Sequence, residues 1–333
     1  MKNIIASLLL LCLLAAATGY TLNLPPAGTS GSDFHVNYGE TVRTTAKRLE
    51  ENQIIRSADY FVLLSYIWRR QSIKSGKYEL HRGMTSLDIL KKMTRGEILT
   101  GRVTIPEGFN LFQIAGRLDE TGICDEADFL MYAHDEDFLA SIRIYSPSAE
   151  GYLFPDTYVF PQESDPRDII AQMHKRTLKE LENLDALYSD SRIHDILTLA
   201  SLIEEEARIP GERALISAVF HNRLRKNMRL DCDPTVRYAV KNFDGPLTYR
   251  DLDSDSPYNT YRRRGLPPTP ISSPGRESLR AALRPAQSNY LFFVARNDGS
   301  HYFSTNLREH SRAVDYYQKG VKNGFRDRQK RAD

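Results

Sequence analysis

The N-terminus places the strongest constraint on this chain, because after Lys2 no charged residue follows until Asp33. The dense apolar part covers residues 4–17, and with the uncharged residues after it the segment 1–24 is long enough to cross a bilayer. Two interpretations stay open. A signal peptide would be cleaved near the small residues Ala15–Ala17, whereas a retained anchor would keep Lys2 on the inner side of the membrane. Both export the rest of the chain, and we expect the anchor.

The composition is that of an ordinary globular protein. The 333 residues suffice for two domains, or for one domain with a smaller attachment, and 41% of them are hydrophobic and 26% charged. The formal net charge of +2 argues against a nucleic-acid-binding protein, which needs a concentrated basic face. The basic runs Arg262–Arg264 and 326–331 are short, and we expect both to lie in solvent.

Cysteine and histidine usage indicates no metal cofactor and no disulfide framework. Of the three cysteines, Cys12 lies in the membrane segment, which leaves Cys124 and Cys232. These two could pair in an oxidising compartment, but we expect unlinked or buried thiols. No group of cysteines and histidines has the spacing of a zinc site.

The first exported part has the pattern of a small α+β module. Segment 25–36 is rich in Pro, Gly and Ser and predicts a linker. Residues 37–101 then combine two segments of helical period with a short strand near Tyr78 and a further helix capped by Thr85 or Ser86.

The region 102–325 is predicted to be a larger α+β domain, followed by a basic tail, 326–333. Its helical periodicity is expected in four segments, 166–184, 191–208, 211–227 and 307–319. Residues 230–274 show little periodicity, but their aromatic content favours an ordered loop. Ser273-Pro274 predicts the start of a helix, and Asp298-Gly299 predicts the turn of a β-hairpin.

Three consecutive glutamates end the helix expected at 191–208. Leu199, Leu202 and Ile203 form an apolar stripe that Glu206 continues at the i+7 position. Glu205 should point away from this stripe into solvent, and Glu204 should lie at its margin. Burial against apolar neighbours makes a carboxyl group harder to ionise, as a general acid for a glycosidic bond requires.

The alternative is a helix that frays near Glu206, with the carboxylate in solvent or paired with Arg213. The stretch permits a general acid without demanding one.

Several blocks of the sequence, in order, resemble the endolytic murein (peptidoglycan) transglycosylase family of YceG-like bacterial proteins. They are "EGYLFPDTYVF", "ASLIEEEA", "VFHNRLRKNMRLDCDPTVRY", "YNTYRRRGLPPTPISSPGRESLRAA" and "FSTNLREH". The likeness extends from the membrane segment to the last helix.

The resemblance implies a single-pass protein of the cell inner membrane, with a cytoplasmic N-terminus and a periplasmic C-terminal part. That part would consist of a LysM-like module at 37–101 and a catalytic domain at 102–325. The enzyme would cut nascent peptidoglycan strands between N-acetylmuramic acid and N-acetylglucosamine and leave 1,6-anhydro ends, which terminates strand elongation. It would need no cofactor, and peptidoglycan synthases would be its protein partners.

The resemblance also assigns site residues. The second glutamate of the family's Glu-x-Glu pair maps onto Glu206, which the helical-face argument selects independently. The family usually has Thr where this chain has Ala207, which puts a local hydrogen bond in doubt. Candidate substrate-binding residues in the matching segments are Asn222, Asp233, Thr235, Tyr258, Asn259 and Thr260. Each of them has a structural alternative, such as a turn or a packing contact.

Two rival functions stay open. A hydrolytic muramidase would need a second carboxylate, for which Asp233 or Glu204 are candidates, although we expect Glu204 and Glu205 to be surface charges. A non-enzymatic peptidoglycan-binding scaffold would keep the fold alone. Glu150 and Asp156 are expected to be structural, and the LysM-like module could bind glycan or serve as a spacer.

Overall fold

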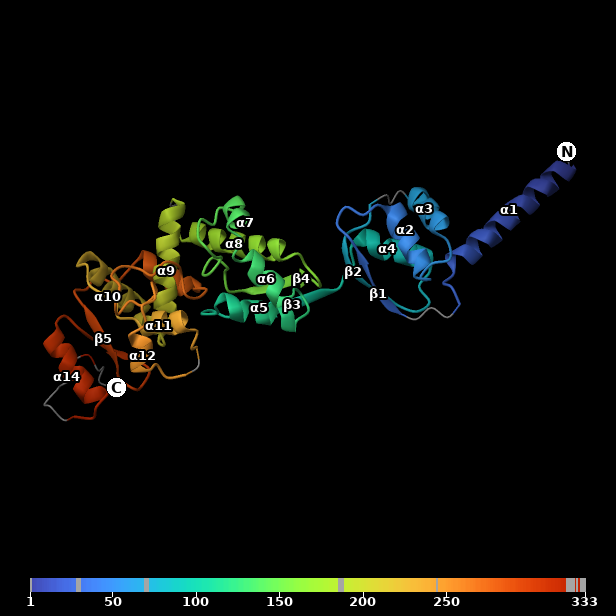
Figure 1. Cartoon of the computed structure of the whole chain (residues 1–333). Helices are drawn as coiled ribbons and strands as arrows, with labels where there is room; N and C mark the ends of the chain where they lie inside the picture. Colours follow the sequence, from blue (N-terminus) through green and yellow to red (C-terminus); the bar gives the residue numbers. More distant parts are fainter. Residues whose placement is uncertain are drawn as a thin grey trace. The chain divides into compact units, whose positions relative to one another are not determined.

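The computed structural model describes residues 2–27, 31–68, 72–184, 189–243 and 245–321, together with 327 and 329. The chain forms two compact units, which are described separately (Figure 1). The first unit consists of Met1–Arg102, Thr121–Cys124 and Val159–Ser164. The second consists of Val103–Glu120, Asp125–Tyr158 and Asp165–Asp333.

The first unit contains the N-terminal helix and the small α+β module. Its elements are α1 (Lys2–Asn23), β1 (Ser32–Val36), α2 (Val42–Glu51), α3 (Ala58–Ile67), β2 (Gly76–Leu80) and α4 (Ser86–Arg95). β1 and β2 are antiparallel, with Phe34 opposite Tyr78. The helix expected after Thr85 is confirmed, because Thr85 and Asp88 form a reciprocal capping box at the start of α4.

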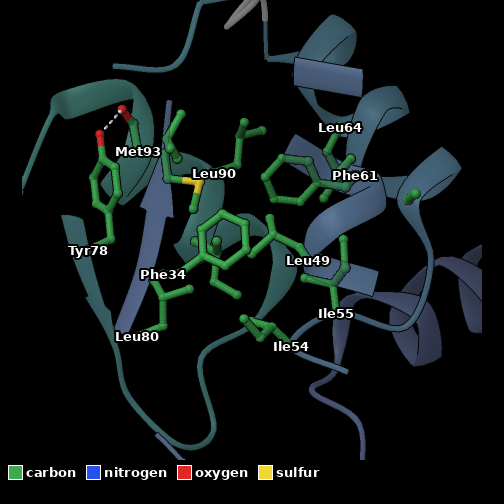
Figure 2. Close-up of a cluster of buried hydrophobic side chains, with 14 of the residues drawn as sticks. Phe34, Leu49, Ile54, Ile55, Phe61, Leu64, Tyr78, Leu80, Leu90 and Met93 are labelled. Carbon is green, nitrogen blue, oxygen red and sulfur yellow. Dashed lines mark hydrogen bonds between the residues drawn. The ribbon is translucent and has the colours of Figure 1, made fainter. Parts of the chain in front are cut away.

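The module has its own hydrophobic core, in which side chains from every element after α1 meet (Figure 2). Phe34, Leu49, Phe61 and Leu90 are all at most 4% exposed. The Tyr78 hydroxyl donates to the backbone carbonyls of residues 74 and 93, at 2.7 and 3.1 Å, so this polar group of the core is paired.

The segment 25–36 is not only a linker. Residues 32–36 form β1, which places Phe34 and Val36 in the core. This strand escaped prediction because only two apolar residues alternate in it, directly after a Pro, Gly and Ser-rich stretch. The carbonyl of Pro25 also accepts from Arg56 Nη2 at 3.0 Å, so this end of α1 is held against the module.

α1 has the length and composition of a membrane span. Over Ile4–Asn23 its mean hydropathy is 2.1 and none of it is buried, and no other helix in the described part of the chain passes the same test. The helix has 22 residues and is about 33 Å long at 1.5 Å per residue, which matches the hydrocarbon core of a bilayer. This supports a single-pass membrane anchor.

The second unit is mostly helical, with short paired strands. In chain order its elements and the strands that flank it are β3 (Thr100–Thr104), α5 (Leu111–Glu120), α6 (Glu126–Tyr132), α7 (Glu136–Ser141), β4 (Thr157–Pro161), α8 (Pro166–Asn183), α9 (Asp190–Glu206), η1 (Pro210–Glu212), α10 (Arg213–Arg225), α11 (Asp233–Val240), α12 (Tyr249–Leu252), α13 (Arg276–Leu283), β5 (Phe292–Ala295), β6 (His301–Ser304) and α14 (Leu307–Tyr317). β3 pairs with β4, and β5 pairs with β6. The expected hairpin at Asp298-Gly299 is confirmed by the antiparallel register from Phe292–Ser304 to Ala295–His301.

Two predictions for this unit were wrong in detail. The stretch 230–274 contains two helices, α11 and α12, whose eight and four residues are too short to show a helical period. α13 begins after Gly275, not at Ser273-Pro274, because the Ser273 amide donates to the backbone of Phe109 at 2.8 Å. Arg262–Arg264 are exposed, as predicted.

α9 is the central helix of the second unit and carries the glutamates. Leu197, Ala200, Leu202 and Ile203 are fully buried. The helix packs against α10, α11 and α13. The C-terminal end of α9 is therefore fixed by three neighbours, which positions the three glutamates with little freedom.

Candidate active site

Glu204 is a buried structural residue. Its Oε1 accepts from Arg213 Nη2 at 2.9 Å, and its Oε2 accepts from the Gly275 amide at 2.8 Å. The side chains of Glu204 and Arg213 are 7% and 13% exposed. The expectation of a surface charge was wrong, because α13 folds back over the end of α9 and covers the carboxylate. Since Arg213 is used here, it is not the partner of Glu206.

Glu205 is exposed as a residue, as its position on the helix predicts. Its carboxyl end nevertheless lies close to the backbone of Gly108: a Cβ added at that glycine would lie 3.2 Å from Glu205 Oε1. Loss of hydration at the carboxyl and the charge of Glu204 raise the pKa of Glu205 to about 7, and the nearby Ser272 hydroxyl acts in the opposite direction.

Glu206 lies in the wall of a cavity of about 480 Å³, which we call the Glu206 cavity. Burial raises the pKa of the Glu206 carboxyl to about 7, and the charges of Asp233 and Glu205 act in the same direction. A hydrogen bond from the Cys232 thiol lowers the pKa and offsets part of this effect. A carboxyl group with this pKa carries its proton for much of the time at neutral pH.

The walls of the Glu206 cavity come from segments far apart in the sequence. Besides Glu206 they comprise Arg223, Arg229, Leu230, Asp231, Asp233, Tyr261, Phe292, Phe293, Leu307 and His310. These residues belong to α10, the loop before α11, the start of α11, the loop after α12, β5 and α14. The cavity is therefore built by the hairpin and the last helix folding against α9 and α10.

Arg223 holds one wall in place. It is 7% exposed and donates to the carbonyls of Leu230 and Leu291, at 2.8 and 2.6 Å. It also pairs with Asp231 at 3.0 Å. One buried cation therefore ties the loop before α11 to the start of β5.

The cavity lining includes both a polar and an aromatic pair. The Tyr261 hydroxyl donates to Asp233 Oδ1 at 2.5 Å, which gives a polar side near Glu206. The Phe292 and His310 rings stack with centroids 5.1 Å apart and planes at 23°. Aromatic faces of this kind suit the apolar faces of sugar rings.

Of the predicted substrate-binding residues, Asp233 lies in the Glu206 cavity, whereas four others are buried and paired with protein groups. Thr235 and Thr260 share a hydrogen bond at 2.9 Å, and Thr260 Oγ1 accepts from the Cys232 amide at 3.0 Å. The Asn259 amide donates to two carbonyls of its own loop at 2.9 and 2.8 Å. The Asn222 amide donates to the carbonyls of residues 288 and 290 at 2.9 and 2.8 Å.

These four residues shape the loops around Glu206 and have their polar groups occupied. Tyr258 is half-buried, its hydroxyl bonds Thr269 Oγ1 at 2.8 Å, and its ring packs on Tyr238.

Glu150 and Asp156 have structural partners, as expected. Glu150 is fully buried and accepts from the Leu111 amide and the Tyr238 hydroxyl, both at 3.1 Å. Burial raises its pKa to about 8. Asp156 pairs with Arg176 at 2.9 Å.

Cys124 and Cys232 are both buried, and Cys232 carries a free thiol. Within the residues that the structure describes, no three His, Cys, Asp or Glu side chains are grouped to hold a metal ion.

Sequence reasoning missed the residues that the last third of the chain brings to Glu206. The hairpin and the final helix were predicted as elements, but nothing in their pattern linked them to α9. The signal was indirect, since "YLFFVA" offers more aromatic side chains than a four-residue strand can bury.

The site is thus a single buried carboxyl group in the wall of a cavity with aromatic and polar sides. A family model described as the YceG-like family matches residues 34–316. The chain belongs to this family.

Named relatives agree with this assignment. The endolytic murein transglycosylase of Bacillus subtilis is 34% identical over 321 residues, covering 90% of this chain and 89% of the relative. The enzyme of the same name from Streptococcus pneumoniae is 29% identical over 314 residues, covering 83% of this chain and 56% of the relative. A crystal structure of a yceG-like protein from Listeria monocytogenes has a TM-score of 0.59 and 35% identity, and the match covers 86% of this chain and all of that one.

Proposed function

We propose that this chain is a membrane-anchored endolytic murein transglycosylase and that Glu206 is its catalytic acid. The observation that carries the assignment is the position of Glu206, whose carboxyl group lies in the wall of a 480 Å³ cavity and has a pKa that loss of hydration raises to about 7. The names of the relatives support the substrate class, which is peptidoglycan.

A single carboxyl group suffices for this reaction. The proton of Glu206 passes to the oxygen that bridges N-acetylmuramic acid and N-acetylglucosamine, and the C–O bond breaks as positive charge develops at the muramoyl C1. The Glu206 carboxylate then takes the proton of the muramoyl C6 hydroxyl, whose oxygen attacks C1. Because the nucleophile belongs to the same sugar, its effective concentration is high and no water is consumed. The product has a 1,6-anhydro end, and the acid regains its proton.

The cavity walls supply the remaining functions of the site. Phe292, His310 and Leu307 give the cavity an apolar lining that we expect to contact a sugar ring, although the Phe292 ring itself stacks on His310 and lies under the Arg223 guanidinium. Asp233 is held by Tyr261, so its negative charge lies near Glu206 and favours the protonated form of that acid.

A hydrolytic muramidase is the closest alternative. Glu204 is unsuited as its second carboxylate, because Arg213 and the Gly275 amide occupy both of its oxygens. Asp233 is the remaining candidate. Substitution of Asp233 by Asn tests this point: a muramidase would lose activity, whereas a transglycosylase keeps a substantial part and shows a lower pKa for its acid.

The role of the first unit is a second part of the proposal. We take residues 37–101 as a LysM-like module that contacts glycan and 102–325 as the catalytic domain. A shallow pocket of about 360 Å³, lined among others by Thr41, Val62 and Tyr66, is the candidate contact surface. With α1 retained in the membrane, Lys2 on the cytoplasmic side and the chain after α1 in the periplasm, the enzyme would act beside the peptidoglycan synthases of the inner membrane.

A further inference from the structure

α3 is apolar on every side, although only one side of it packs into the module core. Its one charged residue is Asp59, in the first turn. Phe61 and Leu64 point into the core and are 0% and 7% exposed (Figure 2). A helix that is apolar all round is normally buried all round. The other side of α3 therefore needs an explanation.

The other side of α3 carries large exposed apolar side chains, together with the exposed Asp59 in the first turn. Leu63 (52%) and Ile67 (63%) lie on it, Trp68 (48%) follows directly after the helix, and we call these three residues the α3 face. Tyr66 lines the pocket at Thr41 and Val62 and is not part of this face. Contiguous exposed patches of large apolar side chains mark surfaces that contact a partner or a membrane.

The end of the membrane span is attached directly to the same module. The Asn23 side-chain oxygen accepts from the Leu87 amide, the first turn of α4, at 3.0 Å. Arg56, which precedes α3, donates to the carbonyls of Leu24 and Pro25 at 3.1 and 3.0 Å. No flexible spacer lies between the span and these contacts, so the module is held at the membrane surface.

One contact fixes the depth of α3. A Cβ added at Gly19 would lie 3.9 Å from the Tyr60 ring, so the ring lies beside α1 at a point four residues, or about 6 Å, before the end of that helix. Leu63 and Ile67 follow Tyr60 by three and seven residues and lie on the same side of α3. The α3 face therefore starts beside a part of α1 that itself belongs to the span.

We propose that the α3 face is inserted in the bilayer interface, so that the module binds the membrane through a second, non-spanning contact. The partner is the boundary between lipid headgroups and acyl chains, where an apolar helix face lies 5–10 Å deep in general. Trp68 has the position that tryptophan favours in membrane proteins. Lys91 Nζ lies 5.4 Å above the Trp68 ring and is placed to meet anionic headgroups.

This inference rests on the retention of α1 but not on the proposed catalysis. Its effect on function would be to limit the reach of the module, because two membrane contacts define its orientation where one would allow it to swing. An enzyme held in this way acts on glycan close to the bilayer.

Trp68 is the only tryptophan in the chain, so its fluorescence reports on the α3 face without a label. The experiment uses the full chain, with α1 verified by intact mass, reconstituted in vesicles of phosphatidylethanolamine and phosphatidylglycerol. Quenching is measured with aqueous iodide and with lipids that carry a nitroxide near the headgroup. A double variant, L63Q/I67Q, is compared with V159Q, because Val159 is an exposed apolar residue of the same unit with a similar exposure of 53%.

We expect the nitroxide lipids to quench the fluorescence of Trp68 in the wild type and in V159Q. In these two proteins iodide should quench it at least about twofold less than it does in L63Q/I67Q. The proposal is overturned if iodide quenches the wild type in vesicles as strongly as L63Q/I67Q while lipid quenching is absent. It is also overturned if both quenchers fail, because a second copy or another protein then covers the face. Neither result bears on cleavage, which is measured separately by product release.

Discussion

At the residue scale, the function depends on Glu206 differing from the two glutamates that precede it. Glu204 is neutralised by Arg213, and Glu205 is exposed as a residue although its carboxyl end contacts protein. Glu205 and Glu206 have similarly raised pKa values, so acidity alone does not separate them. Position does, because Glu206 lines the cavity and Glu205 does not.

Replacing Glu206 with Gln should reduce cleavage by at least about 100-fold, the low end of what a general acid contributes. The matched control is Glu205→Gln, which should retain activity within about threefold, because that residue donates no proton to the substrate. Release of soluble fragments from purified peptidoglycan measures both. Equal losses in the two variants would contradict the assignment.

The pH dependence follows from the proton on Glu206. The active form is protonated and the pKa of Glu206 is about 7, so kcat/KM should fall as the pH rises through 7. At one pH unit above the pKa it should be about a tenth of its value at low pH. Asp233→Asn and Glu205→Gln each remove a negative charge that raises this pKa. Both should move the falling limb to lower pH, with unchanged shape. A limb that stays in place in Asp233→Asn would show that another group titrates.

The same pKa predicts a stability effect. The folded-state pKa of Glu206 is about 7 and its usual value is 4.5, so the folded state binds more protons than the unfolded state between these limits and loses stability as the pH rises. Glu206→Gln should therefore raise the free energy of unfolding at pH 8 by about 1–3 kcal/mol and change it little at pH 4. Denaturant unfolding of the full chain in detergent at the two pH values provides the measurement. A variant less stable than wild type at pH 8 would mean that the Glu206 carboxylate is stabilised in the fold.

At the element scale, the junction of α9, α10 and α13 fixes the site. Arg213 begins α10, Glu204 lies in the last turn of α9, and Gly275 caps α13. One ion pair and one hydrogen bond from a backbone amide therefore join all three helices at Glu204, two residues before Glu206.

Glu204→Gln should lower the free energy of unfolding by about 3 kcal/mol, because it leaves the Arg213 charge with little hydration and no counterion. The double variant E204Q/R213Q should lose less than the sum of the two single variants, since the unpaired charge is gone. Additive losses would indicate that the pair contributes through the separate contacts of its members.

How much of this the sequence could predict depends on the length of each pattern. α8 and α9 are long and periodic, and both were predicted within a few residues, as was the hairpin with its Asp-Gly turn. The periodicity of α9 distinguishes Glu206 from the two glutamates before it, but the catalytic role proposed for it comes from the family resemblance. β1, α11 and α12 were not predicted, because these elements of four to eight residues show too few repeats of the strand or helix period in their hydrophobic pattern. Thr235, Asn259 and Thr260 match the family's motifs, yet their side chains are buried and paired, a distinction that needs three-dimensional contacts.

At the scale of the whole molecule, a span of about 33 Å leads without a spacer into the small module. If α1 is retained, the chain should remain in the membrane fraction after alkaline carbonate extraction, and its intact mass should include residues 1–24. A soluble chain beginning after Ala17 would establish cleavage and would also remove the basis for the α3 contact.

The chemistry of the product tests the central claim most directly. Purified chain is incubated with uncrosslinked peptidoglycan strands, and the new glycan ends are analysed by mass spectrometry. We expect 1,6-anhydromuramoyl ends, lighter by one water than reducing ends, from the wild type and none from Glu206→Gln. Reducing ends as the main product, or anhydro ends formed equally well without the Glu206 carboxyl group, would contradict the mechanism.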